Sequence, residues 1–184
     1  MPAISSLRSQ RLSELRPDIE KQYVAFRIRF AWFILPVEST YRVIPLEKHI
    51  PKLTFSGNNV PIIDLGKILF GQAKVQTEIP QLVVNGAIVV SKPALIVVKD
   101  RNEALVGILS NSQPALQKIA QDKIVPLPLT YSKRWKVDCI SSMTLPYENF
   151  PSLFLIDCDR LVSSIINVKK KLQKLSQDVS DTNQ

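Results

Sequence analysis

The sequence is poor in the residues that catalytic and metal sites require. Its 184 residues include one histidine, two cysteines and five glycines. His49 has no cysteine near it in the sequence, and no serine lies in a Gly-x-Ser-x-Gly motif, so we expect His49 to be a surface or interface residue. The glycines form no phosphate loop or dinucleotide fingerprint, and a single histidine argues against a four-ligand zinc site. We therefore expect no enzyme activity, no catalytic residue, no metal and no cofactor.

Long hydrophobic runs are also missing. A membrane helix needs roughly 18 to 20 uncharged apolar residues, and the best candidate, residues 79–91, is interrupted by Pro80, Asn85 and Gly86. Residues 1–22 have no apolar centre, which argues against a signal peptide. The two cysteines, Cys139 and Cys158, favour a reducing compartment, with a disulfide between them as the alternative. These features predict a cytoplasmic protein.

What the sequence does contain is a substantial apolar fraction and a spread of basic charge. Hydrophobic residues make up 45% of the chain and charged residues 22%, which is enough apolar material for a core. The net charge of +8 is not concentrated in any one region. Composition alone therefore does not indicate nucleic-acid binding, and it is compatible with an acidic protein partner.

Short strands separated by turns dominate the pattern. Residues 23–30 alternate with period two, and residues 31–37 form a continuous apolar run, which together indicate a half-buried strand and a more buried partner. Asn85-Gly86 between apolar runs predicts a hairpin, and residues 95–109 predict a second one. We expect one or two helical turns at residues 112–120. Many short strands without regular helices between them predict an antiparallel barrel or a pair of barrels.

Three aspartates and one glycine have local structural interpretations. Asp64 is expected to cap a helical turn over residues 65–70. Asp157 and Asp159 lie where a strand leads into a helix; capping is the favoured interpretation, and a metal site or a shared proton is the alternative. Gly107 interrupts a strand and indicates a bulge or a close backbone approach.

The two ends of the chain are expected to be helical. Residues 3–22 carry a loose apolar stripe, so we assign residues 1–22 to an N-terminal helical extension and residues 23–166 to the main domain. Residues 167–184 would complete a last helix and a frayed tail. That helix has an apolar seam with heptad-like spacing, which we expect to dock on the chain's own barrel or to form a dimerising coil. The seam consists of Leu161, Ile165, Val168, Leu172 and Leu175.

Four segments in order resemble the CheW-like domain family. Residues 26–46 are similar to its opening strands and its Val-Ile-Pro segment. Gly57 to Leu65 resembles the Gly-x-x-x-Pro-Val-Ile-Asp-Leu signature. Residues 95–109 are similar to the central hairpin with its Val-Gly pair, and residues 154–162 (FLIDCDRLV) resemble the closing strand and the entry to the last helix.

The resemblance implies a mainly β fold, a CheW-like pair of interlocked five-stranded β-barrels with N- and C-terminal helices. It also implies a non-enzymatic signalling adaptor. Such adaptors couple a CheA-type histidine kinase to a chemoreceptor or photoreceptor in bacterial chemotaxis, phototaxis or pilus motility. The expected location is cytoplasmic, either free or recruited to membrane-bound receptor arrays, without membrane insertion.

The resemblance further implies which residues contact partners. One surface would include Val43, Ile44 and Pro45 together with the turn Ser56, Gly57 and Asn58, and another would lie near Gly107. Ser56 stands where the family has an arginine, and residues 72–94 are longer than usual in the family. We therefore expect altered partner contacts.

Two alternatives remain at this point. One is a small barrel that binds single-stranded nucleic acid through basic and aromatic side chains. Its candidate residues are Arg27, Arg29, Trp32, Lys133, Arg134 and Trp135. The other is a homodimer held together by the seam of the last helix.

Overall fold

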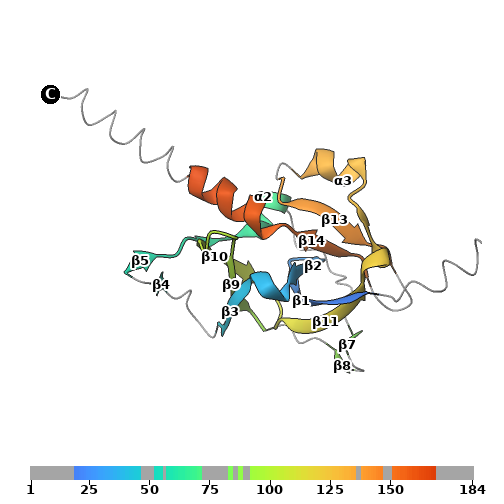
Figure 1. Ribbon diagram of the computed structural model, residues 1–184, viewed down its shortest axis with the longest axis horizontal. Helices are drawn as coiled ribbons and strands as arrows, with labels where there is room; N and C mark the ends of the chain where they lie inside the picture. Colours follow the sequence, from blue (N-terminus) through green and yellow to red (C-terminus); the bar gives the residue numbers. More distant parts are fainter. Residues whose placement is uncertain are drawn as a thin grey trace, which may run out of the picture.

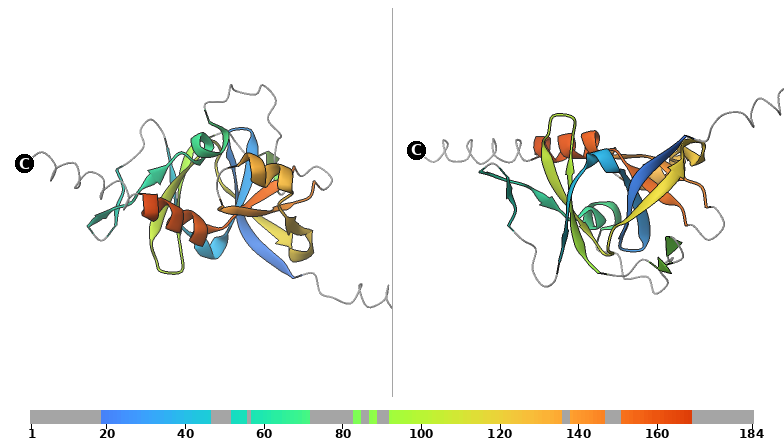
Figure 2. Two further views of the ribbon diagram at one scale, coloured as in Figure 1. Left: turned by 90° about the horizontal axis from the view of Figure 1, so that it is seen from above. Right: turned by 60° about the horizontal axis from the view of Figure 1, so that its bottom comes forward.

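The chain forms two curled β-sheets that share a hydrophobic core (Figure 1). The structure, a computed structural model, describes residues 19–46, 52–55, 57–71, 83–84, 87–88, 92–135, 138–146 and 151–168. Figure 2 shows how both sheets bend around the space between them. The predicted mainly β fold is confirmed.

The larger sheet has six strands in the order β11-β1-β2-β14-β13-β12. Its neighbouring strands are antiparallel except β14 and β2, which run parallel. The strands are β1 (Glu20–Ile28), β2 (Ala31–Pro36), β11 (Ala115–Ala120), β12 (Ile124–Pro126), β13 (Ile140–Thr144) and β14 (Leu153–Ile156).

The smaller sheet has four strands in the order β3-β9-β10-β6, with β10 and β6 parallel. These are β3 (Thr40–Pro45), β6 (Ile62–Ile63), β9 (Ala94–Lys99) and β10 (Leu105–Ser110). The ten strands thus divide six and four rather than five and five. The parallel pair of β2 and β14 joins the opening and closing strands of the domain in one sheet.

Two short hairpins form separate two-stranded sheets. One consists of β4 (Thr54–Phe55) and β5 (Asn58–Asn59), and the other of β7 (Val83–Val84) and β8 (Ala87–Ile88). The second is the hairpin that the Asn-Gly pair predicted. The predicted hairpin of residues 95–109 is present as β9 and β10.

Short helices complete the described fold. They are α2 (Leu65–Phe70), α3 (Leu129–Arg134), the 3-10 turns η1 (Val37–Ser39) and η2 (Gln121–Lys123), and a last helix over residues 158–168. The Asp64 carboxylate accepts a hydrogen bond from the Lys67 backbone N–H at 2.9 Å, so the predicted cap of α2 is confirmed. None of the helices in the described segments is long and apolar enough to cross a membrane.

The core has two parts because β1 and β2 are buried on both faces. Phe26 and Phe33 point into the main core between the sheets, where Leu65 of α2 also packs. Tyr23 and Trp32 point to the opposite face and form a second cluster within the larger sheet. Successive side chains of a strand point to opposite faces, so each strand supplies both clusters. The expected half-buried strand is therefore a fully buried one over much of its length.

A buried polar network holds the crossing from β10 to β11. The Arg27 backbone N–H donates to the Ser112 hydroxyl at 2.9 Å, and the Ser110 hydroxyl donates to the Arg27 carbonyl at 3.1 Å. The Asn111 backbone N–H donates to the same carbonyl at 2.7 Å. Ser110 and Ser112 are both buried, and buried polar groups cost stability unless they are paired. These bonds fix the smaller sheet to the larger one.

Two predicted elements differ from the structure. Residues 20–22 belong to β1, not to an N-terminal helix, because they pair with residues 118–120 of β11; residues 1–18 lie outside the described part. Residues 115–120 form β11 rather than helical turns, because the edge of β1 supplies hydrogen-bond partners that a local pattern does not reveal. The helix α3 was not predicted.

Candidate functional site

The strand β3 is an edge strand that exposes apolar side chains. It pairs with β9 on one side and has no second strand partner among the described residues. Tyr41 and Val43 are 43% and 40% exposed. Large apolar side chains on an open edge are a feature of binding surfaces, because proteins otherwise protect such edges. Val43 and Pro45 were predicted to contact a partner, and the structure places them here; Ile44 is half-buried.

The hairpin β4–β5 extends this surface. Phe55 is 45% exposed, and its ring lies 5.2 Å from that of Tyr41 at an interplanar angle of 79°. Edge-to-face rings at this separation attract each other, so the contact ties the hairpin to β3. Gly57 has a φ of +79°, which a side chain would disfavour, and Asn58 after it is exposed. Ser56 lies outside the described residues.

A groove of about 410 Å³ opens between β3 and the larger sheet. The strands β3 and β11, which border this groove, lie on the underside of the molecule, which is turned forward in the right panel of Figure 2. Val43 and Pro45 form one wall, and Val24 and Leu116, which are register partners on β1 and β11, form the other. Leu116 is 60% exposed. The remaining lining residues are Lys92, Pro93, Ala94, Gln113, Pro114 and Ala115.

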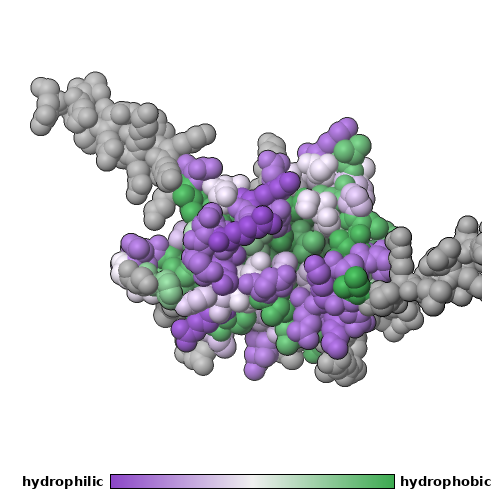
Figure 3. Space-filling view, viewed as in Figure 1, coloured by the Kyte–Doolittle hydropathy of each residue, from purple (hydrophilic) through white to green (hydrophobic). Residues whose placement is uncertain are grey.

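A second cleft, of about 470 Å³, has the opposite character. It lies between η1, the β9–β10 turn and the start of the last helix, where hydrophilic residues dominate the face seen in Figure 3. Its charged side chains are mostly occupied by one another: Asp159 pairs with Arg101 at 2.8 Å, and Glu103 pairs with Lys99 at 2.9 Å. Asp100, buried, accepts two backbone N–H bonds from its own turn.

The predicted capping role is confirmed for Asp157. Its carboxylate accepts the Arg160 backbone N–H at 3.1 Å at the start of the last helix. Asp159 instead accepts the Arg101 backbone N–H at 2.9 Å and so ties the β9–β10 turn to this helix. No three His, Cys, Asp or Glu residues of the described segments are arranged to hold a metal ion.

The two cysteines are free and buried. Burial raises the pKa of Cys139 to about 11, and burial raises that of Cys158 to about 12 despite a hydrogen bond with Ser39. The thiolate is the reactive form of cysteine, so both side chains are protonated and unreactive at neutral pH.

Gly107 is buried in the smaller sheet rather than exposed on a surface. Its backbone N–H donates to the Pro61 carbonyl at 2.8 Å, and it pairs with Ile62 of β6. A Cβ at this position would lie 3.0 Å from Leu95 Cδ1 and 3.2 Å from Ile62 Cγ1. The predicted close approach is thus confirmed, and the residue's contacts are internal.

The seam of the last helix docks on its own domain where it is described. Leu161 is part of the main core, and Ile165 is half-buried against it. Val168 is 56% exposed, and Leu172 and Leu175 lie outside the described residues. Leu161 and Ile165 therefore pack internally and Val168 does not, and whether the seam as a whole docks or dimerises stays a prediction.

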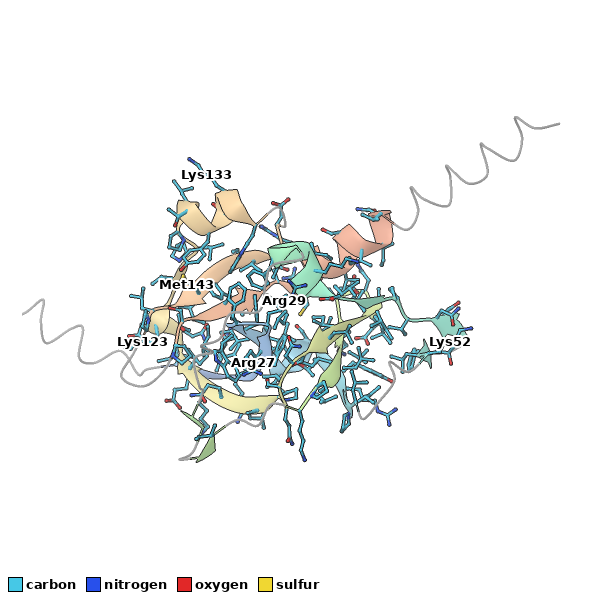
Figure 4. All side chains as sticks on the ribbon, turned by 180° about the vertical axis from the view of Figure 1, so that it is seen from behind. Arg27, Arg29, Lys52, Lys123, Lys133 and Met143 are labelled. Carbon is cyan, nitrogen blue, oxygen red and sulfur yellow. The ribbon has the colours of Figure 1, made fainter. Side chains whose placement is uncertain are left out.

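The residues proposed for nucleic-acid binding do not form one surface. Trp32 and Trp135 are 2% and 5% exposed, so neither ring is free to stack on a base. Figure 4 shows Arg27 and Arg29 in the middle of the molecule and Lys133 on the outer end of α3. The Arg134 side chain and His49 lie outside what the structure describes.

Sequence reasoning identified one wall of the groove but missed the other. The sequence pattern predicted helical turns around Leu116, and it indicated no binding role for Lys92. The only local signal for the second wall is Pro114, which disfavours a regular helix around it. The proximity of β11 to β3 depends on the chain crossing between the sheets, which no local pattern reports.

Comparisons with known proteins give a structural neighbour but no sequence match. No protein-family profile matches the chain, and no curated protein sequence matches it. The structure is similar to the crystal structure of the scaffolding protein TtCheW from Thermoanaerobacter tengcongensis, with a TM-score of 0.49 and 16% sequence identity. The similarity covers 75% of this chain and 89% of that chain.

Proposed function

We propose that this protein is a non-enzymatic signalling adaptor that couples a CheA-type histidine kinase to a receptor. The observation that carries the proposal is the apolar groove between β3 and β11, which is continuous with the exposed Tyr41–Phe55 pair through β3. The described residues that line the groove can bury apolar surface of a partner and include no reactive group. Burial of apolar surface is the main contribution to protein–protein recognition. Val43 and Pro45, placed at a partner contact by the resemblance, line the groove.

The motif residues behind the resemblance have mutually dependent places in the fold. Ile62 and Ile63 of the Pro-Ile-Ile-Asp-Leu segment form a parallel pair with Gly107 and Ile108 of the Val-Gly strand. Asp64 caps α2, and Asp157 caps the last helix. The residues that carry the resemblance thus join segments that lie more than 40 residues apart in the sequence. This arrangement supports the resemblance.

The proposal is tested by binding to the purified regulatory domain of a CheA-type kinase from the same cell. We expect Val43→Ser to weaken this binding about tenfold, because an apolar side chain at the centre of an interface contributes on the order of 1–2 kcal/mol. Val168→Ser is the matched control, since Val168 is also exposed but lies on the last helix outside the groove. Its affinity should equal that of the unaltered chain.

Two results would count against the adaptor function. One is the absence of measurable binding to the kinase domain at concentrations of tens of micromolar. The other is an equal loss of affinity in both variants, which would remove the groove from the contact. Thermal unfolding of each variant establishes that the loss does not come from unfolding.

A further inference from the structure

A third cavity, of about 240 Å³, is lined by residues of the β1–β2 turn, α2, α3 and β14. Six of its nine described lining residues are aromatic: Phe30, Trp32, Phe70, Tyr131, Trp135 and Phe154. The groove at β3 and the cleft at η1 have no aromatic side chain among their described lining residues. This cavity, which we call the aromatic pocket, therefore has a chemistry of its own.

The rings of the aromatic pocket hold one another in place. The Trp135 ring lies 5.9 Å from that of Phe70 at an interplanar angle of 87°, and 4.6 Å from that of Phe154 at 74°. The Phe30 ring lies 4.4 Å from that of Phe70, and the Tyr131 ring lies 5.4 Å from that of Trp135. Aromatic rings attract one another edge to face or with offset faces. Rings fixed at these different inclinations offer both kinds of contact to a further ring.

The depth of the pocket follows from the burial of its rings. Trp32, Trp135 and Phe154 are 2%, 5% and 6% exposed and form its base. Tyr131 is 37% exposed and lies at its rim. Ser152, which is half-buried just before β14, also lines the pocket. A ligand would thus meet an apolar base that is already formed, with two hydroxyl groups nearer to solvent.

The size of the pocket limits what it can hold. An apolar cavity of about 150 Å³ binds benzene, and pockets for drug-sized ligands measure about 300–1,000 Å³. At about 240 Å³ the aromatic pocket lies between these two cases. A helix with its side chains is about 10–12 Å across and does not fit. The volume suits a molecule of one or two fused rings.

The charge around the pocket disfavours a cationic ligand. Aromatic faces also attract cations, so a quaternary ammonium group is the alternative occupant. None of the described residues that line the pocket is acidic. The helices α2 and α3 carry Lys67 and Lys133 but no aspartate or glutamate, and Figure 4 shows Lys133 on the outer end of α3. A positive ligand would therefore be repelled by its surroundings, whereas an uncharged ring would not.

We propose that the aromatic pocket binds a small planar aromatic molecule of one or two fused rings without positive charge. The ligand ring would lie against Trp135 and beside Tyr131, and a polar substituent would point to the hydroxyl of Tyr131 or Ser152. The inference is independent of the adaptor function. The aromatic pocket and the groove at β3 share no described lining residue.

The two tryptophans make binding directly observable. Trp32 and Trp135 are the only tryptophans of the chain, and both line the pocket. The ¹⁵N-labelled full chain therefore gives two indole N–H signals in an NMR spectrum, and both report on the pocket. Added indole should shift both signals with a dissociation constant on the order of 0.1–1 mM, which is what a ligand of about nine heavy atoms can reach.

A matched pair of probes tests the preference for an aromatic ring. Phenol and cyclohexanol share a hydroxyl group and a six-membered ring and differ in aromaticity. We expect phenol to bind at least about threefold more tightly, because ring–ring contacts add to the burial of apolar area. Tetramethylammonium, the cationic probe, should bind more weakly than phenol.

Variants separate the pocket from other ring contacts. Tyr131→Ala removes a ring at the rim and should weaken indole binding about fivefold. Tyr41→Ala is the matched control, since Tyr41 is also partly exposed and its ring contacts Phe55, but it lies outside the pocket; it should leave the affinity unchanged. Ser152→Leu should abolish binding by filling the pocket from its half-buried side. The remaining amide signals show whether each variant is folded.

Three results would overturn the inference. The first is the absence of a shift in both indole N–H signals up to about 5 mM indole, well above the expected dissociation constant. The second is a tetramethylammonium or cyclohexanol affinity that equals or exceeds that of phenol. The third is an equal effect of Tyr131→Ala and Tyr41→Ala on indole binding. Kinase binding is measured separately, so the adaptor function stands or falls on its own result.

Discussion

Replacing Gly107 by valine tests whether this residue packs the core or contacts a partner. A Cβ at Gly107 would lie 3.0 Å from Leu95 Cδ1 and 3.2 Å from Ile62 Cγ1. Both distances are shorter than an ordinary carbon–carbon contact of about 3.5–4.0 Å. The two γ-methyl groups of valine need further space in a buried strand flanked by β9 and β6. The side chains of Leu95 and Ile62 must therefore move.

The expected cost of Gly107→Val is about 3 kcal/mol. Overpacking a well-filled core costs typically about 1–3 kcal/mol, and the upper part of this range applies because the site is enclosed on both sides. With a denaturant slope of about 2 kcal/mol per molar urea, the unfolding midpoint should fall by about 1.5 M. Leu95→Ala alone should cost a similar amount through the cavity it leaves.

The double variant decides between packing and other causes. If valine and Leu95 compete for the same space, the double variant should be more stable than the sum of the two losses by about 1–2 kcal/mol. Urea unfolding followed by circular dichroism gives all four stabilities. Additive losses, or a Gly107→Val variant of unchanged stability that fails to bind the kinase domain, would refute the packing role and return Gly107 to an interface.

Three further predictions concern the cap, the last helix and the thiols. Asp64→Ala should lower the free energy of unfolding by about 1 kcal/mol, because the Lys67 backbone N–H loses its acceptor; an unchanged urea midpoint would contradict this. Leu161→Ala should cost about 3 kcal/mol and Val168→Ala less than about 0.5 kcal/mol, because only Leu161 is in the core; similar values would place the helix differently. Burial raises the pKa of Cys139 to about 11 and that of Cys158 to about 12, whereas in the unfolded chain both ionise near pH 8.5. The unfolded state thus loses protons first, and stability should fall between about pH 9 and pH 11 by about 1.4 kcal/mol per pH unit for each thiol. Urea titrations should show a shallower fall in Cys158→Ala.

The local elements were largely predictable because their causes are local. Asn85-Gly86 between β-branched runs allows little besides a tight hairpin, and the structure pairs Val83 with Ile88 across it. Asp64 ahead of an apolar turn is a cap by the chemistry of its carboxylate. The interruption at Gly107 indicated a close approach, and the strand β6 supplies it.

The sheet assignments and the second groove wall were not predictable from one sequence. Whether residues 115–120 form a helix or a strand depends on the free edge of β1, almost 100 residues earlier in the chain. The same long-range pairing brings Leu116 opposite Val43. The intrinsic preference of residues 115–120 for helix or strand is weak, so tertiary contacts determine which of the two they form.

The groove follows from the way the two sheets are joined. Val43 and Leu116 belong to different sheets, so the distance between the walls is set by the core between the sheets and by the crossing at Ser110 and Ser112. A close-packed core transmits small displacements because it has little free volume to absorb them. Substitutions in that crossing should therefore alter partner affinity without touching the groove. Partner recognition at the proposed groove would thus depend on the rigidity of the junction between the two sheets.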